Sequence, residues 1–208
     1  MARYRGSVCK LCRREKVKLF LKGERCFSPK CAIERRGSPT GQSVEVRERL
    51  SGYGLQLREK QKARRMAGIM EKQFRKYFRM AERKKGLPGE NLLRLVECRL
   101  DNIVFRLGFA SSKNQARQLV QHRHIRVNGR CVDIPSYQVK VGDKISLDEK
   151  SKDLEVVKAS REKAQERGIP SWMEFDQSTN TATILKLPKR EEISIPVQEQ
   201  LIVELYSK

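Results

Sequence analysis

Four cysteines near the amino terminus form two close pairs. Cys9 and Cys12 are separated by two residues, and Cys26 and Cys31, which follow after thirteen residues, are separated by four. Two such pairs can supply the four thiolate ligands of a tetrahedral zinc ion. The spacing therefore predicts one zinc ion held by all four cysteines, with an iron-sulfur cluster as the alternative that spacing leaves open. A site with four protein ligands has no open position, so its expected role is structural rather than catalytic.

Four unrelated buried cysteines are the other explanation of this cluster. The position of the cluster beside many lysines and arginines favours metal binding over that explanation. Disulfides are not expected, because a secreted disulfide scaffold would be shorter and would carry a signal peptide that this sequence lacks.

The charge of the chain points to a polyanionic partner. Lys and Arg number 46 against 25 Asp and Glu, which gives a net charge of +21. Residues 1–65 hold 19 basic and 6 acidic residues, whereas residues 151–208 hold 9 and 10. Nucleic acid is the expected partner. An acidic membrane surface is the alternative, but the sequence has no long apolar segment and no basic helix with an aromatic face. We therefore predict a cytoplasmic protein that binds neither a membrane nor a small-molecule substrate.

Basic residues surround the two cysteine pairs. A metal that folds this segment would hold the cations in a fixed array suited to phosphates. Each one considered alone is more often a solvated charge. The residues expected to contact nucleic acid here are Arg3, Tyr4, Arg5, Lys10, Arg13, Arg14, Lys22, Arg25, Lys30, Arg35 and Arg36.

A linker over residues 37–46 precedes a predicted helix. Ser51 can cap this helix, which should run to about Met66, just before Gly68. Five of the eight residues from 58 to 65 are basic, and only one acidic residue offsets them. Self-repulsion disfavours such a face unless an anion neutralises it, so RNA contact is preferred over a solvated face. The candidates are Arg47, Arg49, Tyr53, Gln56, Arg58, Lys60, Gln61, Lys62, Arg64 and Arg65.

Residues 69–97 should continue as helices, interrupted at Gly86–Gly89. Phe74, Tyr77 and Phe78 have helical spacing. These aromatic side chains are expected in the core rather than as platforms for bases.

The next segment predicts two helices against a small antiparallel sheet. Apolar residues from Leu100 to Leu107 have helical spacing, and Gly108 can end that helix. Ser111 or Ser112 can cap a second helix through Gln121 whose free amides suit a phosphate. Lys113 and Arg117 are expected on its outer face.

Two hairpins are expected after the second helix. Alternating residues around Asn128-Gly129 give the strongest hairpin signal. A second alternating pair flanks Gly142-Asp143. The two histidines here are expected to be structural or to face RNA rather than to bind a metal. The RNA-binding candidates of this region are Ser111, Ser112, Lys113, Gln115, Arg117, Gln118, His122, His124, Arg126, Asn128 and Arg130.

The same region resembles the RNA-binding module named after the fourth small-subunit ribosomal protein. The resemblance rests on a series of short matches. These are Arg99-Leu-Asp-Asn102, Gly108, Ser111 through Val120, His124, Val127-Asn-Gly129, Ile134-Pro-Ser-Tyr137 and Gly142-Asp143. The module also occurs in pseudouridine synthases and a tyrosyl-tRNA synthetase, so by itself it indicates RNA rather than the ribosome.

The rest of the chain resembles the bacterial 30S ribosomal protein family itself. The four-cysteine amino terminus, the segment Tyr53 to Lys62 and the end from Pro196 to Tyr206 carry this resemblance. It implies early binding to the 5′ domain of 16S rRNA at a multi-helix junction, which nucleates the body of the 30S subunit. It also implies contact with the fifth small-subunit ribosomal protein, an influence on translational accuracy, and proximity to mRNA at the entry channel. Some members of the family repress their own operon.

Two positions depart from the family pattern. The linker Ser38-Pro-Thr-Gly-Gln-Ser43 replaces the usual Pro-Pro-Gly-Gln-His-Gly. Arg123 stands where the family usually has glycine, between His122 and His124. If that position needs a positive φ, arginine is strained there.

The expected fold class is α+β, with four parts. An amino-terminal four-cysteine metal-binding knuckle with its linker takes residues 1–44, and a mainly helical domain takes residues 45–97. An inserted helix-turn-helix and small antiparallel sheet form the RNA-binding module of residues 98–160. A carboxy-terminal segment, residues 161–208, should contribute a strand and a final helix that packs back on the helical domain.

Two other functions are less consistent with the sequence. An RNA-modifying enzyme would need a catalytic domain beyond the small module, and the sequence shows no glycine-rich phosphate loop, nucleophile elbow or open metal site. A zinc-dependent transcription factor would need a recognition helix, usually on a dimer, and no dimerising heptads are present. A structural, non-enzymatic RNA-binding protein is therefore predicted.

Overall fold

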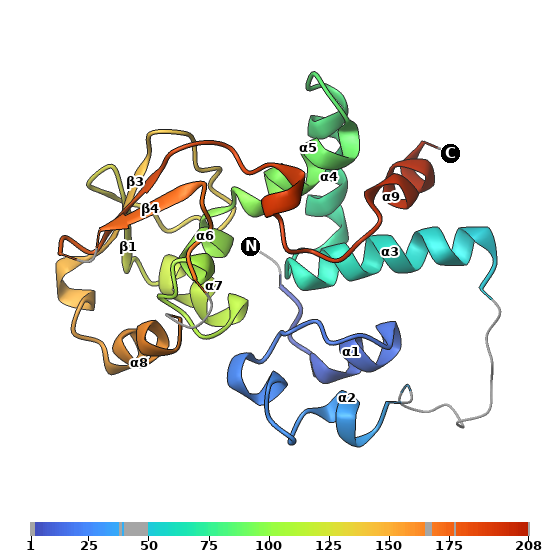
Figure 1. Ribbon diagram of the computed structural model, residues 1–208, viewed down its shortest axis with the longest axis horizontal. Coiled ribbons are helices and arrows are strands. Elements are labelled where there is room, and N and C mark those ends of the chain that lie inside the picture. Colours follow the sequence, from blue (N-terminus) through green and yellow to red (C-terminus); the bar gives the residue numbers. More distant parts are fainter. Residues whose placement is uncertain (1–2, 38, 40–49, 165–167, 177, 208) are drawn as a thin grey trace. The chain divides into compact units, whose positions relative to one another are not determined.

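The computed structural model describes residues 3–37, 39, 50–164, 168–176 and 178–207. The chain forms two compact units (Figure 1). The first joins residues 1–92 to residues 195–208, and the second is residues 93–194.

The first unit is helical. Its long helix α3 (Gly52–Met66) begins where the sequence predicts, because Ser51 Oγ accepts a hydrogen bond from the amide of Gly54 at 3.2 Å. It ends just before Gly68, which has a φ of 66°. The other elements are α1 (Cys9–Glu15), η1 (Gly23–Cys26), α2 (Ala32–Arg35), α4 (Glu71–Glu82), the start of α5 (Pro88–Glu97) and α9 (Glu199–Tyr206).

The core of the first unit joins the middle of the chain to its end. Phe74, Tyr77 and Phe78 on α4 are buried, as predicted. From α9, Ile202 is fully buried and the ring of Tyr206 lies 4.6 Å from that of Phe78, centroid to centroid. The α9 helix packs along α3. The last residues of the chain therefore form part of this unit's core.

The second unit combines helices with one five-stranded antiparallel sheet. The strand order is β2-β1-β3-β5-β4. The elements are α6 (Leu100–Arg106), α7 (Lys113–Gln121), β1 (Ile125–Val127), β2 (Arg130–Cys131), β3 (Lys144–Leu147), η2 (Glu149–Ser151), α8 (Glu155–Ala164), β4 (Met173–Asp176), β5 (Thr181–Ile184) and η4 (Arg190–Glu192).

One of the two predicted hairpins forms. Strands β1 and β2 pair through the turn at Asn128-Gly129, where both residues have positive φ. The second predicted hairpin, around Gly142-Asp143, does not form: β3 pairs with β1 on one side and β5 on the other. The amide of Val139 donates instead to the carbonyl of Cys98 at 2.9 Å. The second prediction was wrong because a distant strand supplies the partner.

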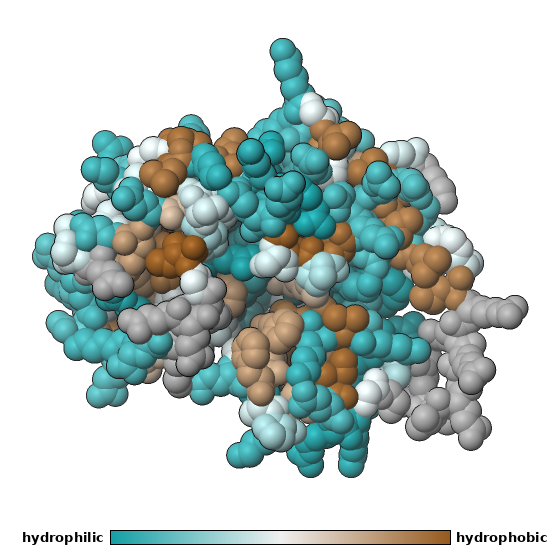
Figure 2. All heavy atoms as spheres, viewed as in Figure 1, coloured by the Kyte–Doolittle hydropathy of each residue, from teal (hydrophilic) through white to brown (hydrophobic). Residues whose placement is uncertain are grey.

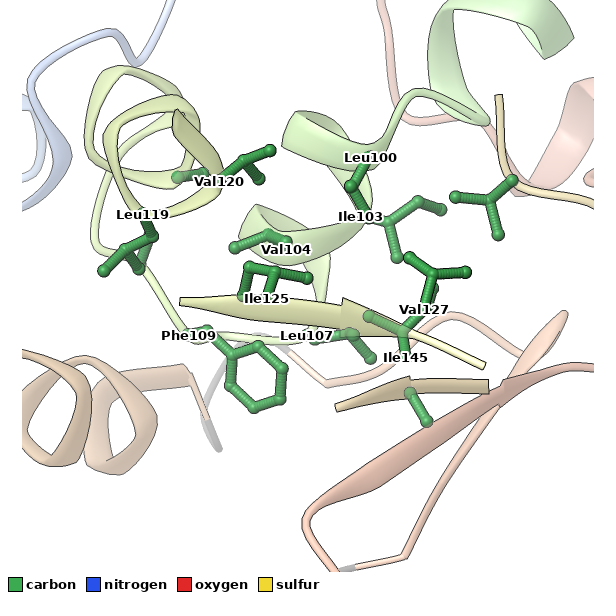
Figure 3. Packing of buried hydrophobic residues seen from close by; sticks show 14 of the residues in the cluster. Leu100, Ile103, Val104, Leu107, Phe109, Leu119, Val120, Ile125, Val127 and Ile145 are labelled. Atoms are coloured by element: carbon green, nitrogen blue, oxygen red, sulfur yellow. The ribbon is translucent and has the colours of Figure 1, made fainter. Parts of the chain in front are cut away.

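The apolar core of the second unit lies between its two first helices and the sheet. Figure 3 shows Leu100, Ile103 and Val104 on the helical side, facing Ile125 and Val127 on β1. The segment that contains β4 and β5 adds buried side chains to this core: Trp172, Met173, Ala182 and Ile184.

The expected α+β class is confirmed, whereas the described residues contain no metal-binding knuckle. The predicted four-part division groups residues 161–208 together. In the structure β4 and β5 complete the sheet of the second unit, and only the residues from 195 onward join the first.

Candidate nucleic-acid interface

The amino-terminal cysteines form part of a small core rather than a metal site. Cys12, Cys26 and Cys31 are buried and Cys9 is half-buried, all as free thiols. Among the described residues, which include all four, no group of three or more His, Cys, Asp or Glu side chains could hold a metal ion. The predicted zinc ion and its iron-sulfur alternative are therefore wrong.

The environment of these thiols explains their structural role. Burial raises the pKa of the Cys12 thiol, which favours the neutral form that packs like a small apolar side chain. The sulfur of Cys26 accepts a hydrogen bond from the amide of Lys22 at 3.3 Å. Leu19 and Leu21 are also buried, and the backbone of Leu19 forms a hydrogen bond with the Cys12 thiol. The spacing of the cysteines matched the number of ligands in a metal site, but it could not show that the thiols are buried.

The basic residues around this core are nearly all on the surface. Arg13 is half-buried and the other predicted contacts are exposed. The predicted contacts Arg47 and Arg49 lie outside the described residues. The exposed set is Arg3, Tyr4, Arg5, Lys10, Arg14, Lys22, Arg25, Lys30, Arg35 and Arg36.

A buried carboxylate ties this amino-terminal segment to α3. The side chain of Glu15 has no exposed surface, and its Oε1 accepts from Arg58 at 3.2 Å and from Arg65. Burial raises the pKa of Glu15, and the charge of Arg65 opposes that shift. Two of the predicted RNA contacts therefore also hold α1 against α3.

Two other predicted contacts on α3 have partners inside the protein. Gln56 is buried and donates to the Glu204 carboxylate at 2.8 Å. Lys60 is buried, lies 2.8 Å from the Glu71 carboxylate and stands over the ring of Tyr206. Burial alone would raise the pKa of Glu71, but the hydrogen bonds from Lys60 and Tyr206 hold it below its usual value. Gln56 and Lys60 therefore stabilise the contact between α3 and α9.

A pocket of about 350 Å³ lies beside α3, and the other polar residues of the helix make local contacts. Arg64 is held by Gln61 at 3.0 Å and lies 3.5 Å from Glu71, and Lys62 pairs with Glu59. Tyr53 is 58% exposed at the start of the helix. The lining combines cations with carboxylates and leucines: Arg14, Glu15, Lys16, Leu50, Leu55, Arg58, Glu59, Lys62, Gln198 and Leu201.

In the second unit the start of α7 is a capped helix end. Ser112 Oγ accepts from the amide of Gln115 at 3.3 Å, and Ser111 donates its hydroxyl to the Gln115 side chain at 2.6 Å. Gln118 is exposed one turn further on. Capping leaves the other first-turn amides available for an anion.

Arg117 was expected on the outer face of α7 and lies inside instead. It is 4% exposed and lies 3.7 Å from the carboxylate of Asp101. That carboxylate also accepts from the buried Arg99, at 2.9 Å. Asp101 therefore lies between two arginines. The helical pattern predicted an exposed Arg117, but its ion pair with Asp101 on another helix holds the side chain inside.

Lys113 is held in a partly apolar setting. It is half-buried, and its ammonium lies 5.9 Å from the centroid of the Phe105 ring. Burial lowers the pKa of Lys113 to about 8, and the carboxylate of Glu97 opposes this shift.

This shift predicts a pH dependence of stability. The ordinary pKa of an unfolded lysine is about 10.4, so between about pH 8 and pH 10.4 the unfolded chain binds more protons at this position than the folded chain. The contribution of Lys113 to stability should therefore rise with pH in that window. Because the side chain is partly exposed, we expect the free energy of unfolding to rise by about 1 to 2 kcal/mol more than in Lys113→Gln. Urea unfolding of both proteins at pH 7.5, 9 and 10 measures this, and parallel curves would contradict it.

The hairpin presents a second group of polar side chains. His122, Arg126 and Arg130 are exposed, with Arg126 paired to Asp148 at 2.6 Å. The Nδ1 of His124 lies 2.7 Å from Ser151 Oγ. Asn128 is used within the fold, since its side chain donates to the Asp143 carboxylate and accepts from the amide of Lys144, both at 2.8 Å.

Comparison with known proteins identifies the family of this chain. The family model for the ribosomal protein S4/S9 N-terminal domain matches residues 3–97, and that for the S4 domain matches residues 98–145. Over all 208 residues, and the whole length of each relative, the chain is 57% identical to the small ribosomal subunit protein uS4 of Pelotomaculum thermopropionicum. The identity is 58% for that of Geotalea daltonii and 55% for that of Desulfosudis oleivorans, over the same span. The chain belongs to the uS4 family.

The resemblance expected from the sequence is thus confirmed over the full chain. Arg123, which stands where the uS4 family usually has glycine, has a φ of 65°. Its guanidinium lies 3.1 Å from the Asp133 carboxylate. The position does need a left-handed backbone, and the ion pair at the surface offsets a small part of the strain.

One basic face of this uS4 chain was missed from the sequence. The four buried positions of α4 recur at helical spacing, so its opposite side carries the charged residues. No carboxylate in the described part of the chain forms an ion pair with the cations on this side of α4. In Figure 2 the teal of hydrophilic residues covers much of the visible surface. In the sequence of α4, groups of apolar and basic residues alternate, and this pattern could have predicted the basic face. The exposed cations are Lys72, Arg75, Lys76 and Arg79 on α4, and Arg83, Lys84 and Lys85 directly after it.

In the described residues no helix is long and apolar enough to cross a membrane.

Proposed function

We propose that this chain is a primary rRNA-binding protein that attaches early to the 5′ domain of 16S rRNA and nucleates assembly of the body of the 30S subunit. Membership of the uS4 family confirms a structural ribosomal protein of the cytoplasm rather than an enzyme. The observation that carries the proposal is the full-length match to uS4 relatives by a chain whose exposed cations come from several separate elements. RNA junctions are recognised through such arrays, because phosphate contacts fix position and shape.

The proposed contacts are the predicted residues that the structure leaves at the surface. Gln56, Lys60 and Arg117 are excluded because they are buried, and Asn128 is excluded because both polar atoms of its exposed side chain are hydrogen-bonded within the fold. The cations of α4 are added. Arg58 and Arg65 remain, since each keeps exposed surface beside the shared Glu15.

The finer partners follow from the family resemblance. The fifth small-subunit ribosomal protein is the proposed protein neighbour, and mRNA is proposed to pass near this chain at the entry channel. Through these contacts the chain influences translational accuracy.

Salt-titrated binding tests the proposal. The protein is titrated with the 16S rRNA 5′ domain, an unrelated folded RNA of equal length and duplex DNA. All three should show a steep salt slope, because each releases counterions from phosphates. Only the 16S fragment should stay tightly bound at high salt. If the three affinities fall together, the chain is a general polyanion binder and the specific function is refuted.

A further inference from the structure

Two phenylalanines form an exposed stacked pair in the amino-terminal segment. The ring centroids of Phe20 and Phe27 lie 5.1 Å apart with planes 29° from parallel. Phe20 is 44% exposed and Phe27 is 70% exposed. Aromatic side chains usually supply core packing, so a stacked pair left at the surface calls for a ligand.

The backbone holds this pair outward. Leu19 and Leu21, on either side of Phe20, are 4% and 8% exposed and anchor the segment. Phe20 has a φ of 51°, a strained conformation for an aromatic residue. The amide of Phe27 donates to the carbonyl of Glu24 at 2.9 Å, which fixes the second ring on η1. The pair is therefore built into the fold rather than carried by a loose loop.

Exposed cations lie close to the two phenylalanines in the sequence. Lys22, Arg25 and Lys30 are exposed. The Nε of Arg25 donates to the carbonyl of Lys30 at 3.4 Å, which brings both sides of the turn together. In Figure 2 apolar side chains lie among hydrophilic ones over the part of the chain that holds α1 and α2. The charges favour an anionic partner with a flat apolar face.

We propose that Phe20 and Phe27 form a stacking platform for an unpaired nucleobase, whose phosphates are bound by the neighbouring cations. A base supplies the flat face and its backbone supplies the negative charge. The inference rests on the proposed function, because it names a further contact within the same RNA complex. An apolar protein partner suits the exposed cations of this segment less well.

Substitutions at Phe27 test the platform in the full chain. Phe27→Leu keeps an apolar side chain and removes the aromatic face, whereas Phe27→Tyr keeps the face. Val156→Ala, at a residue 55% exposed on α8, controls for the loss of exposed apolar surface. Each variant is titrated with the 16S 5′ domain and with single-stranded oligoadenylate. Circular dichroism and melting temperature confirm that each variant is folded.

We expect Phe27→Leu to weaken binding of both RNAs by about fivefold to a hundredfold, the effect of one stacked base. Phe27→Tyr and Val156→Ala should bind like the unsubstituted chain. In Phe27→Trp the new tryptophan adds a fluorescence emission that bound RNA should quench. The chain's own Trp172 is 1% exposed, so RNA should not contact it or quench its emission.

The outcomes separate this inference from the proposed function. Unchanged affinity of Phe27→Leu, or unquenched emission of Phe27→Trp in a chain that prefers 16S RNA, overturns the platform and leaves the proposed function standing. Loss of oligoadenylate binding by Phe27→Leu, in a chain that does not prefer 16S RNA, supports the platform and refutes the proposed function.

Discussion

Replacing four exposed cations of α4 with glutamine is expected to weaken binding to the 16S 5′ domain by about a hundredfold at 0.1 M salt. The slope of log affinity against log salt should fall by about 3, since each phosphate contact contributes roughly 0.7 to 0.9. The helix itself should persist, because glutamine is a good helix former and the apolar face is untouched. The substitutions are Lys72→Gln, Arg75→Gln, Lys76→Gln and Arg79→Gln.

A control variant with the same loss of charge isolates the position from the net charge. Four exposed lysines of the second unit outside the proposed interface serve for this purpose, since their ammonium groups form no ion pair of 4.0 Å or less with a carboxylate of the described residues. Filter binding at several salt concentrations compares the two variants. If both lower the slope equally, the α4 face has no special role. If the α4 variant binds as the unsubstituted chain does, α4 lies outside the interface. The control substitutions are Lys140→Gln, Lys150→Gln, Lys152→Gln and Lys189→Gln.

Local signals in the sequence predicted local structure well. Ser51 and Ser112 cap the helices they were expected to cap, and Asn128-Gly129 forms the expected turn. Arg123 has the positive φ that the family's usual glycine implied. Each of these depends on residues within a few positions of one another, where steric and hydrogen-bonding preferences act directly.

Features that depend on distant residues were not readable from the sequence. Arg117 looked like a surface cation on α7, yet Asp101 on another helix draws it inside. The pairing of Arg58 and Arg65 with Glu15 joins residues more than forty positions apart. The cysteine spacing suited a metal, but the cysteines are largely buried and form no metal-binding group in the described residues. Spacing reports which contacts are possible, and packing decides which of them form.

The largest loss of stability is expected from Trp172→Ala. Trp172 is 1% exposed in the core that also contains the first two helices of the second unit and β1. Truncating such a side chain leaves a cavity and should cost about 3 to 5 kcal/mol of unfolding free energy. Ile169→Ala, at a residue 42% exposed three positions earlier, should cost less than about 1 kcal/mol.

Hydrogen exchange extends this prediction from one residue to the whole unit. Strand β5 pairs with β3, and β4 pairs with β5, so residues near the end of the unit share one sheet with the hairpin. We therefore expect Trp172→Ala to speed exchange not only in β4 and β5 but also in β1 and β3, by a similar factor. This follows because one cooperative core opens as a whole. Faster exchange confined to residues 168–184 would show that β4 and β5 open on their own. The RNA-binding module would then need only the residues up to Leu147, and its stability would not depend on Trp172.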